Sequence, residues 1–125
     1  MTGDEFIYNV DTVTDVLGLF EQTVLLALLR PRTALGREAY GRAILTEVQL
    51  RLERQVTAGS VYATLDRLEQ KGLVSSHLGE RTAARGGRPK RHYVVEAAGI
   101  RALNRSKASV DRVWAGISRP LKGAV

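Results

Sequence analysis

The sequence predicts a mainly α-helical fold that includes one small β-hairpin. Apolar residues recur at helical spacing in three stretches before residue 72 and in one long stretch after residue 97. Between these stretches, two short segments rich in β-branched and aromatic residues flank a loop that contains glycine. A chain of 125 residues has room for one domain and one appended element. We therefore expect a domain over residues 1–96, starting with an arm at residues 1–13, and a terminal helix and tail over residues 97–125.

The first expected helix runs from about residue 14 to residue 29 and is apolar almost all round. Its apolar residues include Leu17, Phe20 and Val24. A helix of this kind is buried on more than one side. In so small a protein, we expect a second subunit to cover part of it. The Arg30-Pro31 pair should end the helix, because the residue before proline avoids the helical region.

Two more helices should follow, joined by a short extended link. The expected helix at residues 38–52 places Tyr40, Ile44 and Val48 on one face. Thr57 is suited to cap the next helix, and Gly72 stands where a helix ends in a left-handed residue. Two helices connected in this way form a helix-turn-helix.

A β-hairpin is expected after the helix-turn-helix. Residues 73–79 alternate loosely, and residues 91–95 have strand composition. No acidic residue occurs from residue 81 to residue 95, and the cations there are Arg81, Arg85, Arg88, Lys90 and Arg91. These cations either contact a phosphate backbone or a minor groove, or belong to a solvated turn. Their position next to the second helix of the helix-turn-helix favours contact with nucleic acid.

The last expected helix spans residue 97 to about residue 118 and carries a coiled-coil-like stripe that ends before Pro120. Two heptad positions are occupied, respectively, by Ile100, Lys107 and Trp114 and by Leu103, Val110 and Ile117. The stripe either packs back on its own domain or pairs with a second copy. The spare apolar surface of the first helix favours a dimer, with Leu17, Phe20 and Val24 completing the expected interface. The elements together make a winged helix-turn-helix with a C-terminal dimerisation helix.

The helix between Thr57 and Gly72 is the candidate for reading DNA. Val61, Leu65 and Leu68 form its apolar stripe, which leaves a second face of small, hydrogen-bonding and cationic residues. Small side chains let a helix approach base edges in the major groove, while Arg and Lys reach phosphate or guanine. A surface helix that is merely polar outside is the alternative. The candidate DNA-binding residues are Tyr40, Ser60, Tyr62, Ala63, Thr64, Arg67, Lys71, Arg85, Arg88, Lys90 and Arg91.

Charge and composition favour a nucleic-acid partner and argue against catalysis. The net charge is +6, although residues 1–21 contain five acids and no Lys or Arg. Non-specific binding to a polyanion, as in a ribosomal protein, stays an alternative. Without cysteine or a glycine-rich phosphate loop, and with His77 and His92 as its only histidines, the chain should have no catalytic site, metal or cofactor. The acidic start and short apolar runs predict a cytoplasmic protein that does not enter a membrane.

In its details the sequence resembles the PadR family of bacterial transcriptional regulators over roughly residues 14–100. The matching segments, in order and spacing, are residues 17–29, Ala39-Tyr40-Gly41, residues 59–69, residues 71–74, Leu78-Gly79-Glu80 and residues 85–91. Glu96 departs from the threonine that usually caps the last helix of the family, and the loop at residues 32–38 is longer than usual. Neither departure lies on the expected DNA face.

The resemblance implies a homodimeric DNA-binding regulator, commonly a repressor. In the family, the tyrosine matching Tyr62 and the small residues of its helix meet DNA, and the hairpin adds backbone contacts. A dimer would place two such helices in successive major grooves of an inverted repeat, about 34 Å apart.

Family members often respond to a small apolar or aromatic effector bound between subunits. Trp114 is a candidate wall for such a site, although a core role is commoner for tryptophan. The rival function is a protein-interaction module that keeps the winged-helix shape without reading DNA sequence.

Overall fold

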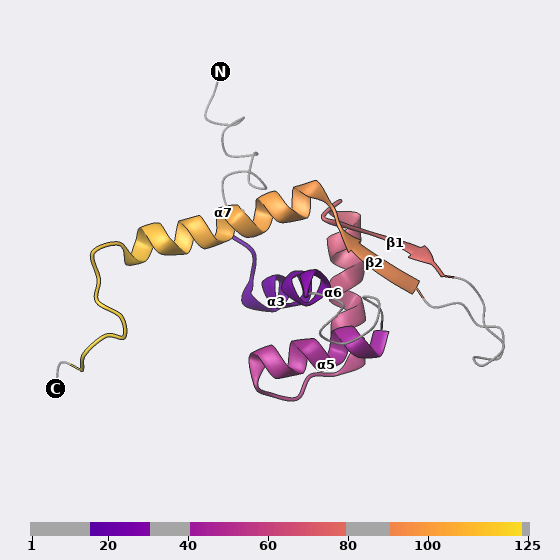
Figure 1. Cartoon of the computed structure of the whole chain (residues 1–125), viewed down its shortest axis with the longest axis horizontal. Helices are drawn as coiled ribbons and strands as arrows, with labels where there is room; N and C mark the ends of the chain where they lie inside the picture. The colour runs from indigo at the N-terminus through magenta and orange to yellow at the C-terminus, as the bar shows by residue number, and fades with distance from the viewer. Residues whose placement is uncertain (1–15, 31–40, 80–90, 124–125) are drawn as a thin grey trace, which may run out of the picture.

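A computed structural model describes residues 16–30, 41–79 and 91–123 of the chain (Figure 1). Its elements, in order, are α3 (Leu19–Leu29), α5 (Gly41–Leu52), α6 (Ala58–Gln70), β1 (Val74–Leu78), β2 (Arg91–Val95) and α7 (Ala97–Trp114). Helices α3, α5 and α6 form a compact group, the hairpin lies beside α6, and α7 runs from the hairpin past α3 (Figure 1). The predicted fold class, mainly helical with one antiparallel hairpin, is confirmed.

The hydrophobic core lies where α3, α5 and α6 meet. Its largest fully buried apolar side chains are Val24, Leu25, Ile44, Val48, Val61, Leu65 and Leu68. The predicted apolar stripe of α6 therefore faces inward. Because removing apolar side chains from water is the main stabilising contribution to such a core, this stripe fixes which side of α6 faces solvent.

Both predicted ends of α6 are confirmed. The Thr57 hydroxyl accepts a hydrogen bond from the Ser60 backbone N–H at 3.1 Å, as an N-cap residue does. At the other end, Gly72 has a φ of +78°, and the Leu73 N–H donates to the Leu68 carbonyl at 2.9 Å. A left-handed glycine followed by such a bond is a common way for a helix to end.

The hairpin pairs β1 with β2 in antiparallel register. Val74 lies opposite Val95, and Leu78 lies opposite Arg91. Val74 and Tyr93 are buried against the helices. On the far side of the pair, the His77 and His92 rings stack with their centroids 5.2 Å apart. The loop at residues 80–90 lies outside the described residues.

The junction between the hairpin and α7 explains the unusual residue at the start of α7. Glu96 is the N-cap residue, but its side chain makes no capping hydrogen bond. Its carboxylate instead accepts a hydrogen bond from the Ser75 hydroxyl at 2.5 Å, and its backbone N–H donates to the Leu73 carbonyl at 2.9 Å. The Glu96 side chain thus connects α7 to β1 rather than capping α7, while the Glu96 carbonyl accepts the Gly99 and Ile100 N–H groups of the first turn.

Two predicted helix bounds are wrong. Helix α3 begins at Leu19 rather than near residue 14, because Gly18 is extended and the Leu17 N–H bonds to the Ser106 hydroxyl at 2.9 Å instead of joining the helix. Helix α7 ends at Trp114 rather than near residue 118. Ala115 leaves the helical region and Gly116 is left-handed with a φ of +81°, so the helix ends well before Pro120 and leaves Ile117 outside it.

Candidate nucleic-acid interface

The surface of α6 that faces solvent is centred on residues opposite its buried stripe. Gly59, Ala63, Asp66 and Gln70 are all exposed, and we call these four residues the outer face of α6. The space next to Gly59 is open: a Cβ built there would have no neighbour within 4 Å. Of the first two residues of the outer face, Gly59 has no side chain and Ala63 has only a methyl group. The backbone of α6 can therefore approach a partner surface closely along this line.

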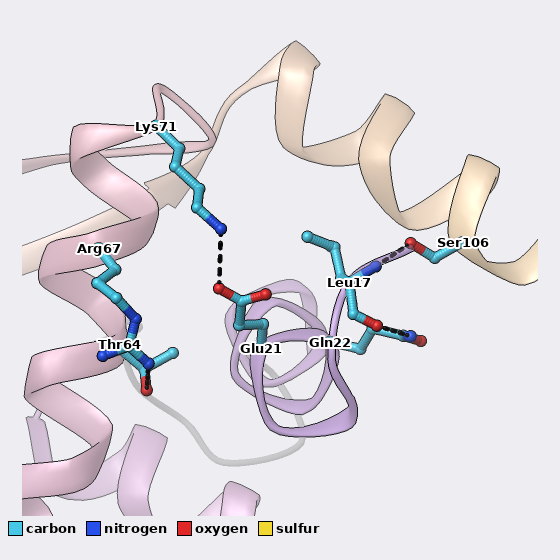
Figure 2. Close-up of polar contacts among 7 residues, drawn as sticks. All are labelled: Leu17, Glu21, Gln22, Thr64, Arg67, Lys71 and Ser106. Carbon is cyan, nitrogen blue, oxygen red and sulfur yellow. Dashed lines mark hydrogen bonds and ion pairs between the residues drawn. The ribbon is translucent and has the colours of Figure 1, made fainter. Parts of the chain in front are cut away.

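Thr64 was expected on the free face of α6, and this expectation is wrong. Its side chain is buried, with 1% of the residue exposed. The Thr64 hydroxyl accepts a hydrogen bond from the Arg67 guanidinium at 3.0 Å (Figure 2). The periodicity explains the error, since Thr64 lies one turn from both Val61 and Leu68 and so borders the buried stripe. Arg67 itself is exposed.

Replacing Thr64 with valine should leave DNA sequence preference unchanged. Valine keeps the shape of the buried side chain and removes only the hydroxyl, and the exposed Arg67 can bond to water instead. We expect the free energy of unfolding to fall by at most about 1 kcal/mol. Competition binding with a set of single-base variants of the preferred site measures the preference. An altered preference at any base pair would show that Thr64 contacts DNA after all.

An open groove of about 520 Å³ runs along one flank of α6. It is lined by Phe20, Arg54, Gln55, Val56, Thr57, Ser60, Ala63, Thr64 and Arg67. Arg54 and Arg67 contribute two exposed cations, and the Ser60 hydroxyl donates to the Thr57 carbonyl at 2.8 Å. Phe20, expected at a dimer interface, lies half-buried in this groove between α3 and α6.

Lys71 is exposed but already has a partner. Its ammonium lies 3.1 Å from the Glu21 carboxylate of α3 (Figure 2). This ion pair connects α6 to α3, and the Glu21 charge offsets the Lys71 charge that was expected to attract DNA. Arg67 bonds to a neutral hydroxyl, so this contact does not offset its charge.

On the other flank, a chain of hydrogen bonds connects α6 to the hairpin. The Ser76 hydroxyl donates to the Glu69 carboxylate at 2.9 Å, and the Arg91 guanidinium donates to the Ser76 oxygen at 2.9 Å. Arg91, at the start of β2, is therefore held beside the end of α6. The outer face of α6 is flanked by Arg54 and Arg67 on one side and by Arg91 on the other.

Tyr62 lies at the edge of the outer face, towards α5. It is 42% exposed, and an added Cβ at Gly41 would lie 2.8 Å from its hydroxyl. Close by, burial raises the pKa of Tyr93 above its usual range, while the Arg91 charge opposes the rise. Tyr93 is accordingly a neutral core residue, whereas Tyr62 is available to a partner.

Only some residues of the predicted dimer interface are exposed and could contact a second subunit. Val24 is fully buried and Leu17 is 8% exposed, so both belong to the core of one subunit; their assignment to a dimer interface is wrong. Leu103 packs against the same core. By contrast, Ile100 and Val110 are 37% and 41% exposed, and apolar surface also remains on α3 at Val16, Leu19, Leu26 and Leu29.

Further along α7, Lys107 is exposed and paired with Asp111 at 2.8 Å, a bond that lowers the pKa of the Asp111 carboxyl. Trp114 is half-buried, with the Arg119 guanidinium 5.9 Å from its ring centroid. The candidate DNA-binding residues Tyr40, Arg85, Arg88 and Lys90 lie outside the described residues.

Known proteins identify the family. The sequence model of the transcriptional regulator PadR-like family matches residues 32–105, which is more than half of the chain. The chain belongs to the PadR-like family. The match covers α5, α6, the hairpin and half of α7. A comparison with curated protein sequences found no match.

Solved PadR-like structures share the fold. A PadR-like transcription factor from Bacteroides fragilis has 25% sequence identity and a TM-score of 0.62, with 84% of this chain and 91% of that chain covered. A PadR-like regulator from Bacillus cereus has 23% identity and a TM-score of 0.62, with 85% and 94% covered. The Orc1 protein of Aeropyrum pernix, solved in complex with DNA, has 23% identity and a TM-score of 0.60; the match covers 83% of this chain and 28% of that chain.

Family membership decides the class of function. PadR-like proteins are DNA-binding transcriptional regulators and not enzymes, which agrees with the expectation that this chain has no catalytic site. In the described part of the chain, no cluster of three or more His, Cys, Asp or Glu side chains could bind a metal. A membrane span would need a long and continuously apolar helix, and the described ranges contain no helix of that kind.

Three of the four residues of the outer face, Gly59, Asp66 and Gln70, are absent from the DNA-binding residues expected from the sequence. The helix period is a sufficient signal for them, since all three lie opposite Val61, Leu65 and Leu68 on a helix of 3.6 residues per turn. The expectation rested on small or cationic side chains; an acid and an amide are neither, and Gly59 has no side chain.

Proposed function

We propose that this protein is a homodimeric, sequence-specific repressor that inserts one α6 helix from each subunit into successive major grooves of an inverted repeat. The observation that carries the proposal is the outer face of α6. It has no bulky side chain at Gly59 and Ala63, and exposed cations lie on both of its flanks. A helix with a low profile and cationic edges fits the major groove, whose two rims are rows of phosphates.

The residues divide into two roles. Arg54, Arg67 and Arg91 contact phosphates, together with the predicted loop cations Arg85, Arg88 and Lys90. Ser60, Tyr62 and Ala63 contact base edges, and Tyr40 and Lys71 complete the contact surface. Phosphate contacts provide most of the affinity and base contacts provide the discrimination. Repression follows if the occupied inverted repeat overlaps a promoter.

Dimerisation through α7 is supported by the apolar residues that one subunit leaves uncovered. Ile100 and Val110 of α7, with Leu19 and Leu26 of α3, are exposed although apolar. In Figure 1 the second half of α7 extends beyond the group formed by α3, α5 and α6. A second copy of the chain would cover this surface if the coiled-coil-like stripes of the two α7 helices packed against each other.

Replacing Arg67 with alanine should weaken binding to every duplex by a similar factor and make binding less sensitive to salt. Each lost phosphate contact lowers the negative slope of log affinity against log salt by about 0.9. Fluorescence anisotropy with a genomic promoter fragment and with random DNA, at several salt concentrations, measures both quantities.

The control for this measurement is Arg101→Ala, which removes the same charge from an exposed site on α7. An equal drop in slope for both variants would mean that Arg67 acts only through net charge. Failure of the unaltered protein to prefer any fragment over random DNA would favour the protein-interaction module instead.

A small apolar or aromatic effector near Trp114 is also part of the proposal. The half-buried indole lies on the surface that a second subunit would cover, so it would form one wall of a site between subunits. The ring also has a partner within its own chain, the Arg119 guanidinium 5.9 Å from its centroid. Indole fluorescence that does not change with any of a panel of planar apolar compounds would remove this part.

A further inference from the structure

We infer that Asp66 is a specificity-determining residue that selects cytosine in each half-site. The inference rests on the proposed function, because it concerns the surface that α6 presents to a major groove. Asp66 lies in the middle of the outer face of α6, between Ala63 and Gln70 along the helix. Its carboxylate is therefore placed where base edges, rather than phosphates, would lie.

The outer face leaves few groups that can form hydrogen bonds with bases. Gly59 and Ala63 have no polar side-chain atom, so only the carboxylate of Asp66 and the amide of Gln70 point from the centre of this face. Thr64 is buried and bonded to Arg67, which removes its hydroxyl from this face. The hydroxyls of Ser60 and Tyr62 lie to either side of the face, Ser60 in the groove beside Arg67 and Tyr62 at the edge towards α5. The closer the backbone comes to the groove at Gly59 and Ala63, the nearer Asp66 lies to the bases.

Asp66 also differs from most acids of the described residues in having no hydrogen-bond or ion-pair partner, although burial, helped by the Asp66 charge, raises the pKa of the Tyr93 phenol. Glu21 and Glu47 form ion pairs, Glu69 and Glu96 accept hydrogen bonds from serines, and Asp111 pairs with Lys107. Within the described ranges, Asp66 accepts no hydrogen bond and pairs with no cation, so its oxygens are available. Glu53, at the turn between α5 and α6, is the other such acid and lines a separate hollow with Thr46 and Leu50 of α5.

An unpaired carboxylate on a DNA-binding face opposes binding, because it repels the phosphates. It can only help where it meets a hydrogen-bond donor. In the major groove, cytosine presents the N4 amino donor, and Asp or Glu accepts from it. Guanine and thymine present acceptors at this edge, and adenine places the N7 acceptor beside its amino group. Asp66 therefore favours cytosine both by attraction and by repelling the other bases.

The test compares the unaltered protein with Asp66→Ala and Asp66→Asn by selection from a duplex library, followed by affinity measurements on single-base variants. The unaltered protein should require a C·G pair at one position of each half-site. Asp66→Ala should reduce the preference for that pair by roughly fivefold or more. Asp66→Asn should shift it towards adenine, with which asparagine forms two hydrogen bonds. Both variants should bind random DNA more tightly than the unaltered protein.

Glu53→Gln is the matched control, since it neutralises the other unpaired acid without touching the outer face. It should leave the selected sequence unchanged. Selection of the same sequence by Asp66→Ala and by the unaltered protein would overturn the inference while leaving the proposed function intact. Selection of no sequence at all by the unaltered protein would overturn the proposed function, and this inference with it.

Discussion

Replacing Gly99 with alanine should destabilise the junction between the hairpin and α7 by about 3 kcal/mol. A Cβ at this position would lie 2.4 Å from the Leu73 carbonyl oxygen and 2.8 Å from Cγ1 of Val95. The first of these neighbours is backbone and cannot rotate away. The same carbonyl accepts the Glu96 N–H that begins α7, so moving it would break that bond as well. Thermal or urea unfolding followed by circular dichroism measures the loss.

The control for Gly99→Ala is Gly59→Ala, also within a helix. At Gly59 the added methyl group would meet no atom within 4 Å. Alanine is the better helix former by up to about 1 kcal/mol, so this variant should be equally or more stable. Equal stability of the two variants would show that α7 can move off the Leu73 carbonyl at no cost. The packing of α7 on the hairpin described above would then be incorrect.

Replacing Val110 with aspartate should convert the proposed dimer into a monomer. A carboxylate would then lie on the exposed apolar stripe of α7 and would be buried without a partner when two copies meet. Because two connected α6 helices bind an inverted repeat with far higher affinity than one, we expect affinity for the full site to fall by about 100-fold or more. Affinity for a single half-site should change little. Analytical ultracentrifugation and DNA-binding titrations measure the two effects.

Ala108→Asp introduces the same charge on the same helix at an exposed position outside the heptad stripe. It should remain dimeric and bind the full site normally. A dimeric Val110→Asp protein would place the interface elsewhere, for example on the exposed leucines of α3 alone. A monomeric unaltered protein that still binds the full site tightly would contradict dimerisation altogether.

The sequence predicted the elements that depend on local patterns. Val61, Leu65 and Leu68 indicated the buried stripe of α6, and Thr57 and Gly72 indicated its ends, because helix period and capping are encoded within a few residues. β2 was predicted at the bounds that the structure shows, residues 91–95.

Contacts between distant residues could not be predicted in this way. The burial of Thr64 and of Val24 depends on how α3, α5 and α6 pack together. Leu17 stays outside α3 because its N–H bonds to Ser106, 89 residues away. The partners of Lys71, Glu96 and Arg91 likewise come from other elements. Asp66 was missed for another reason, since its position was implied by the periodicity but its charge is unusual for a surface that binds DNA.

Two polar contacts at the start of α3 influence the operator spacing that a dimer would accept. Leu17, just before α3, bonds to Ser106 of α7, and Glu21 of α3 pairs with Lys71 of α6 (Figure 2). These bonds join the helix expected to meet the second subunit to the helix expected to enter DNA. A change in the crossing angle of the two α7 copies would therefore alter the separation of the two α6 copies. The range of DNA spacer lengths between half-sites to which the dimer can bind would then be determined at the subunit interface, far from any nucleotide.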